Sequence, residues 1–69
     1  MPITMAKKGE FQSIKKINGK DETKQFLHGL GFVVGSSICI INELGGNIIL
    51  NVKDARIALD KTMANRIIV

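Results

Sequence analysis

The chain is poor in the residues that most often carry chemistry in proteins. Its 69 residues include one cysteine and one histidine, Cys39 and His28, and no tyrosine or tryptophan. A single cysteine excludes an intramolecular disulfide, so nothing points to secretion. Cys39 and His28 would be the only thiolate–imidazole pair. Their predicted positions, on a strand and on the polar face of a helix, give no reason for them to meet, so we predict that the protein is not an enzyme.

Long hydrophobic runs are also absent. The most apolar region, residues 30–41, is interrupted by glycine and serine and falls far short of the roughly 20 apolar residues of a membrane helix. The residues before Lys7 hold no apolar stretch long enough for a secretory signal. We therefore expect one cytoplasmic domain over residues 1–69, which at this length needs nearly all its apolar residues in one core.

Metal and phosphate sites are not indicated either. The histidine, cysteine and acidic residues form no cluster with ligand spacing, and most carboxylates stand at expected turns and helix starts. The glycines Gly29, Gly31 and Gly35 end a predicted helix, whereas a phosphate-binding loop begins one. We expect no metal and no cofactor. His28 is interpreted as a solvated helix residue and Cys39 as a small apolar residue whose strand position points outward.

Positive charge, in contrast, is present in excess and is concentrated early in the chain. The net charge is +4. Residues 1–24 carry six lysines against three acidic residues, which is +3, and residues 25–69 carry four basic against three acidic residues, which is +1. A basic segment suits a nucleic acid, a membrane surface or an acidic protein face. Scattered lysines also serve simply to keep a small apolar domain in solution.

One helix is predicted in the first half of the chain. Asp21 is a suitable N-cap, and the apolar residues that follow share one face of a helix over residues 22–30. Gly31 then fits the left-handed position that ends a helix, and Phe32 folds back on Leu27 in a Schellman-type contact.

The segments on either side of this helix are expected to be a bent strand and a tight turn. Phe11 and Ile14 are spaced by three and cannot share a face of a regular strand, so we predict a bulge or sharp bend between them. Val34-Gly35 fits the centre of a type II turn. All three phenylalanines are assigned to the core: Phe11, Phe26 and Phe32.

The sequence pattern of the second half of the chain predicts strands. Residues 37–44 and 48–53 form a hairpin. Its inward set is Ile38, Ile40, Ile48, Leu50 and Val52. Pairing that set on one face requires a three-residue loop, Gly45–Asn47, which opposes Ile40 to Val52, or an even loop with a bulge.

The remaining segments complete a small barrel. Residues 55–59 form a strand, Asp60 caps one helical turn over residues 61–65, and residues 66–69 form a last strand. Five short strands with one inserted helix after the first strand and a helical turn before the last predict a mainly β fold. The expected architecture is a partly open β-barrel of the SH3-like or OB-like size class.

The order and spacing of these motifs are similar to those of a known family. The positions that match are Leu27-x-x-Leu30-Gly31-Phe32-x-x-Gly35-x-x-Ile38-x-Ile40, Gly45-Gly46-Asn47-Ile48, Val52-Lys53, Ile57-Ala58-Leu59 and Ala64-x-x-Ile67-x-Val69. Together they resemble the ferrous-iron transport protein A family (FeoA). Val34, Gln25 and Gly29 depart from the family's common proline, arginine and acid.

The resemblance implies an SH3-like β-barrel with a helix after the first strand. It also implies a non-enzymatic cytoplasmic accessory protein of bacterial ferrous-iron uptake. The implied partner is ferrous-iron transport protein B, a membrane GTPase, bound on its cytoplasmic side. The alternative from the residues alone is a small basic barrel that binds nucleic acid through its lysines, although it lacks an evident stacking platform.

Two surfaces are candidates for partner binding. The first is the helix–turn surface of Gly31, Phe32 and Val33. The second is the hairpin face of Ile41, Leu44 and Ile49, where alternation points Ile41 and Ile49 outward as neighbours across the hairpin. Exposed apolar patches on small proteins usually mark interfaces. The second surface would instead be core if the inserted helix or the C-terminal segment covered it.

Overall fold

Six strands, two α-helices and one 3₁₀ turn make up the chain in a computed structural model that describes residues 1–69. Their bounds are η1 Ile3–Met5, β1 Phe11–Ser13, β2 Lys16–Ile17, α1 Asp21–Gly29, β3 Ser37–Leu44, β4 Asn47–Val52, β5 Ala55–Asp60, α2 Lys61–Ala64 and β6 Ile67–Ile68. The helix after the opening strands and the helical turn before the last strand lie where the sequence predicts them. The mainly β fold is confirmed.

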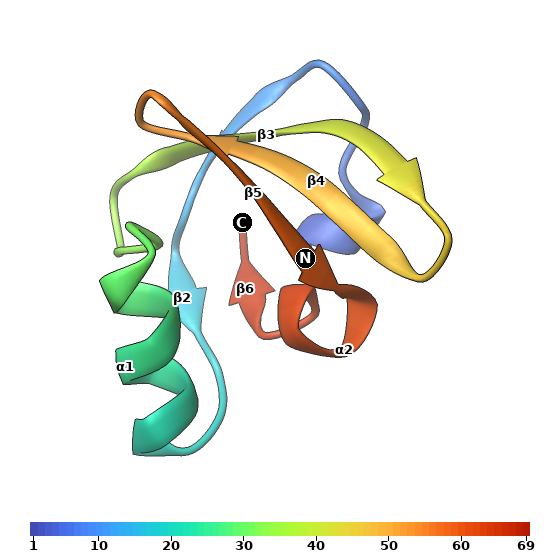
Figure 1. The fold of residues 1–69 in the computed structure, drawn as a ribbon. Coiled ribbons are helices and arrows are strands. Elements are labelled where there is room, and N and C mark those ends of the chain that lie inside the picture. The colour runs from blue at the N-terminus through green and yellow to red at the C-terminus, as the bar shows by residue number, and fades with distance from the viewer.

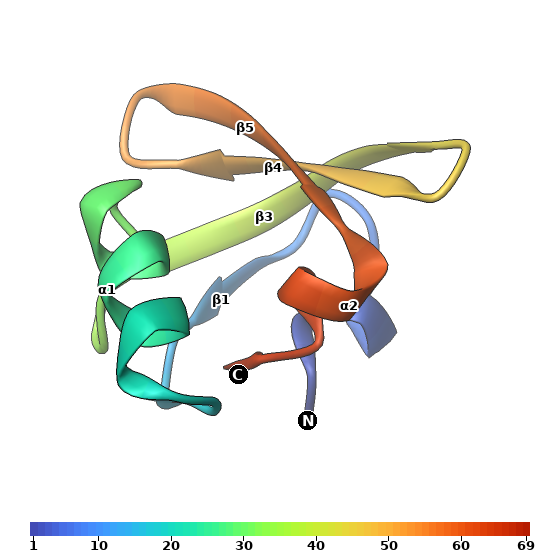
Figure 2. The same cartoon turned by 60° about the horizontal axis from the view of Figure 1, so that its bottom comes forward.

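Two antiparallel sheets enclose the core. The larger has the strand order β1-β3-β4-β5, and the smaller pairs β2 with β6. The larger sheet lies on one side, and β2, β6, α1 and α2 lie on the other (Figure 1, Figure 2). Because β5 and β6 are not paired, the barrel stays open between them. A cluster of 13 buried apolar residues fills the interior.

The opening strand is divided into β1 and β2 at Ile14 and Lys15. The Ile14 N–H donates to the Ser36 carbonyl (2.9 Å), and the Ile14 carbonyl accepts from the Gly35 N–H (2.8 Å). The next N–H, that of Lys15, donates to the carbonyl of Ile68 in β6 (2.8 Å). One peptide step therefore transfers the strand from one sheet to the other. The predicted bend exists, but it follows Ile14 instead of preceding it.

The bend was placed too early because Phe11 was assigned to the core. Phe11 is 64% exposed, and plain alternation along β1 leaves it outside and Ile14 inside. It stands directly opposite Cys39 in the β1–β3 register, so both side chains share the outer face. Cys39 therefore keeps its outward position but is only 6% exposed. The core assignment of Phe26 is also wrong, because this side chain is 53% exposed on α1.

A β-bulge sets the register of the β3–β4 hairpin. The loop is the two-residue turn Gly45-Gly46, and the register shifts at Ile41, the extra residue of β3. The shift keeps Ile40 on the inner face, opposite Leu50 and not Val52. The even loop with a bulge is thus confirmed, and the three-residue loop is wrong.

A complete Schellman motif ends α1, as predicted. The Phe32 N–H donates to the Leu27 carbonyl (3.0 Å), and the Gly31 N–H donates to the His28 carbonyl (3.0 Å). Gly31 has the left-handed φ of +103° that this ending requires. The motif turns the chain inward, and the side chains of Phe32 and Leu27 are both fully buried.

The two helix starts differ in how they are capped. Asp60 caps α2, since its Oδ1 accepts from the Met63 N–H (2.7 Å), as predicted. For α1 the expected cap is wrong: Lys20 occupies the N-cap without a side-chain bond, and Asp21 is already helical. At this position the negative charge of Asp21 still stabilises the helix, because it lies near the positive end of the helix dipole.

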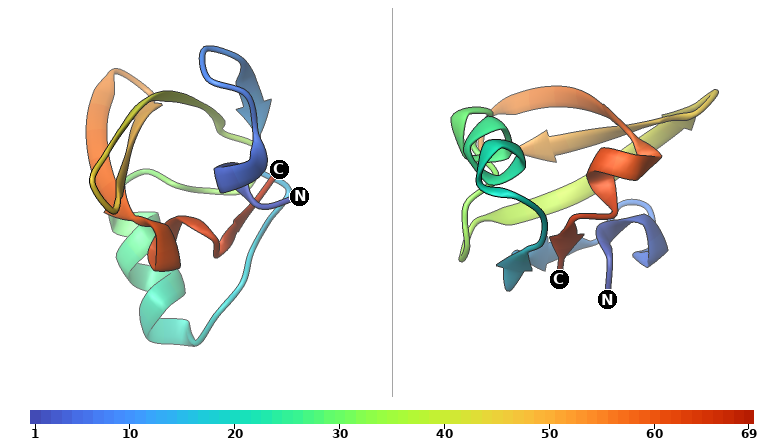
Figure 3. Two further views of the ribbon diagram at one scale, coloured as in Figure 1. Left: turned by 90° about the vertical axis from the view of Figure 1, so that its right-hand side faces the viewer. Right: turned by 90° about the horizontal axis from the view of Figure 1, so that it is seen from below.

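The N-terminal segment is integrated into the barrel, a feature the sequence analysis did not anticipate. The Val69 N–H donates to the Met1 carbonyl (2.7 Å), and Pro2 bridges to Ile68. Ile3 follows in η1 and is fully buried in the core. The two ends of the chain consequently lie side by side (Figure 3).

One ion pair ties the tip of the β3–β4 hairpin to α2. The Lys61 ammonium contacts the Glu43 carboxylate. The hydrogen bond and the charge of Lys61, with a smaller contribution from Lys8, lower the pKa of Glu43 below its ordinary value of 4.5. Both side chains are about half exposed, so the pair contributes little to stability.

We expect the Lys61→Gln substitution to return the pKa of Glu43 to its ordinary range, measured by carboxyl ¹³C NMR titration. Because the folded-state pKa is lowered, the small contribution of the pair is present above the unfolded pKa and is lost as pH falls through the folded pKa. Lys8→Gln is the control and should move the pKa less. An unchanged Glu43 titration in Lys61→Gln would contradict the ion pair.

The turn after α1 offers a test of backbone preorganisation. The Ser36 N–H donates to the Val33 carbonyl (3.0 Å) and Gly35 has φ +93°, which confirms the type II turn. Val34 occupies its second position, is 66% exposed, and its N–H donates no backbone hydrogen bond. Proline is favoured at this position.

We expect Val34→Pro to raise the free energy of unfolding by about 0.5–1 kcal/mol, measured by urea denaturation, because it restricts the unfolded chain. Gly35→Ala should lower it by about 1 kcal/mol or more, because alanine disfavours a positive φ. A Cβ at Gly35 would meet no atom within 4 Å, so that loss reports backbone conformation alone. A destabilised Val34→Pro protein would show that the turn does not tolerate the proline geometry.

Candidate functional site

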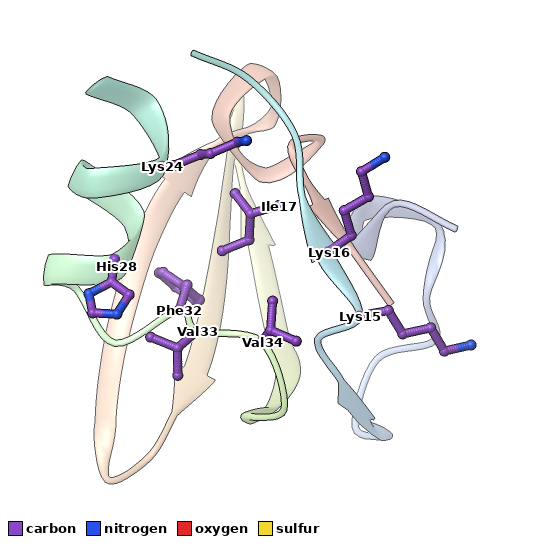
Figure 4. A pocket seen from close by; sticks show the side chains of 8 residues that line it. All are labelled: Lys15, Lys16, Ile17, Lys24, His28, Phe32, Val33 and Val34. Atoms are coloured by element: carbon purple, nitrogen blue, oxygen red, sulfur yellow. The ribbon is translucent and has the colours of Figure 1, made fainter. Parts of the chain in front are cut away.

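One surface pocket, with a volume of about 360 Å³, lies between α1, β2 and the turn that follows α1. The view in Figure 4 shows side chains from all three segments around it. Its lining residues are Lys15, Lys16, Ile17, Lys24, His28, Phe32, Val33 and Val34. The pocket therefore joins the basic first part of the chain to the helix–turn surface.

The pocket has an apolar floor made by the end of α1 and the turn. The Schellman motif drives Phe32 into the core, where its fully buried ring contributes the base of the pocket. The type II turn then carries Val33, half-buried, and Val34, 66% exposed, along the mouth. Ile17 of β2 is half-buried on the opposite side. An apolar side chain that enters here would leave water and contact these residues.

The rim of the pocket is cationic. Lys24 and His28 are four residues apart on α1, so they lie on the same face of the helix. Lys15, at the bend, and Lys16, the first residue of β2, lie across the pocket from α1 (Figure 4). All four side chains are exposed, and no acidic residue lines the pocket.

The helix–turn surface expected from the sequence is partly brought into this site. Val33 lines the pocket as an accessible residue, and Phe32 lines it from below. Gly31 does not line it. Its α-carbon faces Val52, whose methyl groups lie about 4 Å from where a Cβ would be. Gly31 therefore acts by ending α1, and Phe32 by filling the core.

The hairpin face is less continuous than expected. Ile41 and Ile49 are both half-buried, and the direct partner of Ile49 is Asn42 and not Ile41, because of the bulge. Leu44, at the end of β3, is 60% exposed. Ile41 is the bulge residue next to Asn42, so the register agrees with the expectation that Ile41 and Ile49 are neighbours across the hairpin. Leu44 is the most accessible member of this face.

Cys39 and His28 belong to no cluster of reactive side chains. Cys39 lies opposite Phe11 on the outer face, and its Sγ donates to the Ile40 carbonyl (3.5 Å). His28 lies at the pocket rim on α1. No group of three or more histidine, cysteine or acidic side chains is close enough to hold a metal ion. The pocket thus combines an apolar floor with positive charge at its rim.

The lysines of the rim are the part of the site that the sequence analysis missed. Lys15, Lys16 and Lys24 were counted as charge but assigned to no site. The available signal was positional: two of them follow Ile14, where the strand bends, and the third stands one helical turn before His28. Only the packing of α1 beside β2 brings the two groups around one pocket.

Comparison with known proteins identifies the family. The FeoA domain family matches residues 1–69, which is the whole chain. The chain belongs to the FeoA family. A Methanocaldococcus jannaschii protein described as an Fe(2+) transport protein A is 32% identical over 68 residues, 99% of this chain and 83% of that protein. The FeoA family comprises accessory proteins of ferrous-iron transport, so the resemblance seen in the sequence is confirmed.

Solved FeoA structures have the same fold. An iron uptake regulatory protein (FeoA) has a TM-score of 0.88 at 25% identity, with coverage of 97% of this chain and 91% of that one. Iron(II) transport protein A from Clostridium thermocellum has a TM-score of 0.89 at 29% identity, with coverage of 97% and 43%. Stenotrophomonas maltophilia FeoA, described as an SH3 domain protein and solved with zinc, has a TM-score of 0.85 at 20% identity, with coverage of 99% and 87%. These structures confirm the SH3-like fold.

Neither helix of this FeoA protein has the length and apolarity to cross a bilayer.

Within this FeoA protein, the two kinds of pocket residue should respond differently to truncation. Phe32→Ala should cost about 3–5 kcal/mol, the usual range for a fully buried phenylalanine. That loss is a large part of the roughly 3–10 kcal/mol expected for a chain of this size, so the urea midpoint should fall steeply.

His28→Ala, at the exposed rim of the same pocket, should change the free energy of unfolding by only about 0.5 kcal/mol. Both values come from urea denaturation followed by circular dichroism. A loss in Phe32→Ala no larger than that in His28→Ala would contradict the role of Phe32 as the buried base of the pocket.

Proposed function

We propose that this protein is a cytoplasmic accessory protein that binds the cytoplasmic part of ferrous-iron transport protein B, the membrane GTPase of the same uptake system. Its place in the FeoA family supports a role in ferrous-iron transport. The observation that carries the binding role is the single pocket, where exposed cations surround an apolar floor without an acidic residue. Such a pocket on a small non-enzymatic domain is best suited to contact the surface of a partner protein.

The protein would act by changing the conformational equilibrium of the GTPase. A bound accessory protein shifts a partner only as far as its affinities for the partner's states differ. We therefore propose that it binds one nucleotide state of the GTPase more tightly than the other. The SH3-like barrel supplies a rigid surface for this, because the binding residues sit on a helix end, a hydrogen-bonded turn and a strand.

Of the two candidate surfaces, we propose the pocket face as the docking site. It includes Val33 with Phe32 below it, and Gly31 sets its shape. The hairpin face of Ile41, Leu44 and Ile49 is the second candidate, in which only Leu44 is largely exposed. Two apolar side chains of similar exposure, Val34 at 66% and Leu44 at 60%, provide a matched pair for testing.

Amide NMR titration with the soluble cytoplasmic domain of the GTPase, in its GDP and GTP-analogue states, tests the proposal. Signals around the pocket should shift, more strongly in one nucleotide state. Val34→Ser should weaken binding about five- to tenfold, equivalent to about 1–1.4 kcal/mol, because it removes an apolar contact. Leu44→Ser should change the dissociation constant less than about twofold.

The opposite ranking of the two variants would move the docking site to the hairpin face. No shift in either nucleotide state, with the full-length transporter also failing to bind, would refute the partner. Binding to RNA that weakens steeply with salt would favour the nucleic-acid alternative, because phosphate contacts release counterions.

A further inference from the structure

The charged residues that line the pocket are all of one sign. Three lysines and one histidine line it, and none of its eight lining residues is acidic. The only side-chain ion pair within the chain joins Glu43 to Lys61, so the pocket lysines have no carboxylate partner of their own. An acidic ligand would therefore gain charge–charge contacts here without displacing an internal salt bridge.

The arrangement of the cations favours an extended ligand over a compact anion. Lys24 reaches from α1 toward β2, whereas Lys15 and Lys16 extend in different directions from the far side of the pocket (Figure 4). The ammonium groups of Lys15 and Lys16 point outward from the strand, so the three ammonium groups do not converge on one point. A phosphate binds best where donors converge on it, whereas carboxylates spaced along a peptide fit donors spread around a rim.

The apolar floor adds a second requirement. Ile17, Val33 and Val34 leave room for a hydrophobic side chain between the two groups of lysines. The volume of about 360 Å³ is near the lower end of the roughly 300–1,000 Å³ of small-molecule sites. It suits one or two side chains of a peptide.

We propose that the pocket binds an acidic peptide segment of the partner, with a large apolar side chain seated on Ile17, Val33 and Val34 and with flanking carboxylates facing Lys15, Lys16 and Lys24. This inference rests on the proposed function, and it specifies the chemistry of the segment that docks. The apolar residue supplies contact area, and the carboxylates supply orientation and association rate. His28 borders the same site.

A synthetic peptide with one central leucine flanked on both sides by glutamates tests the chemistry directly. Its binding to the full chain is measured by amide NMR titration, and the shifts should concentrate on the pocket residues. The same peptide with glutamines in place of glutamates, and a version with serine in place of leucine, should each bind at least about tenfold more weakly. Equal binding of the glutamine peptide would overturn the proposal.

Charge reversal on the protein gives the matched control. Lys24→Glu and Lys16→Glu should each raise the dissociation constant of the acidic peptide about tenfold. Lys7→Glu makes the same change in net charge at an exposed lysine outside the pocket. It should raise the dissociation constant of the peptide less than about twofold. Equal losses in Lys7→Glu and Lys24→Glu would reduce the effect to overall charge and overturn the proposal.

The same variants separate this inference from the proposed function. If the GTPase domain binds the wild type and Lys24→Glu equally well, the partner stands and the acidic-segment inference fails. If the acidic peptide binds at the pocket while the GTPase domain and full-length transporter do not, the pocket chemistry stands and the partner fails. A short RNA that displaces the peptide from the pocket at physiological salt would overturn the peptide assignment. So would dimerisation through the pocket, detected by sedimentation and by shifts of the pocket amides.

Discussion

Two consecutive N–H groups in the opening strand donate to different segments of the chain, and the rest of the structure depends on that change of partner. Ile14 is bonded to the segment before β3, and the N–H of Lys15 is bonded to β6. Through these bonds one strand belongs to both sheets and holds them around a common core. The same step also decides where the chain carries its charge, because the two residues after Ile14 are the lysines on one side of the pocket. Fold and site therefore share one local cause.

The other side of the pocket follows from how α1 ends. Gly31 allows the left-handed turn, Phe32 enters the core, and the two valines that follow are left at the surface. A helix that ran on would place these residues on a continuous cylinder, with no hollow beside β2. The pocket floor is thus a by-product of a helix stop that the core needs for its own packing. Binding surfaces of this kind cost little extra stability, because the buried anchor is already part of the fold.

The parts of this structure that local rules govern could be predicted from the sequence. The Schellman ending, the type II turn and the Asp60 cap each depend on residues within one turn of one another. The errors came where a distant segment decides the outcome. Phe11 reads as a core residue until its position opposite Cys39 at the outer face is known, and the burial of Ile3 depends on the two ends of the chain meeting. For the same reason the lysines of the pocket could be counted but not placed: their meeting depends on the packing of α1 beside β2.

The pairing of the chain ends has a consequence for topology. Met1 and Val69 are hydrogen-bonded to each other at the edge of the smaller sheet. A polypeptide that starts and finishes at one point behaves geometrically as a nearly closed ring, and such folds tolerate circular permutation and insertion into other chains. New ends opened at the exposed Gly45-Gly46 turn would leave both sheets intact once a short linker joined the original termini. The barrel could in this sense be inserted as one unit into another chain.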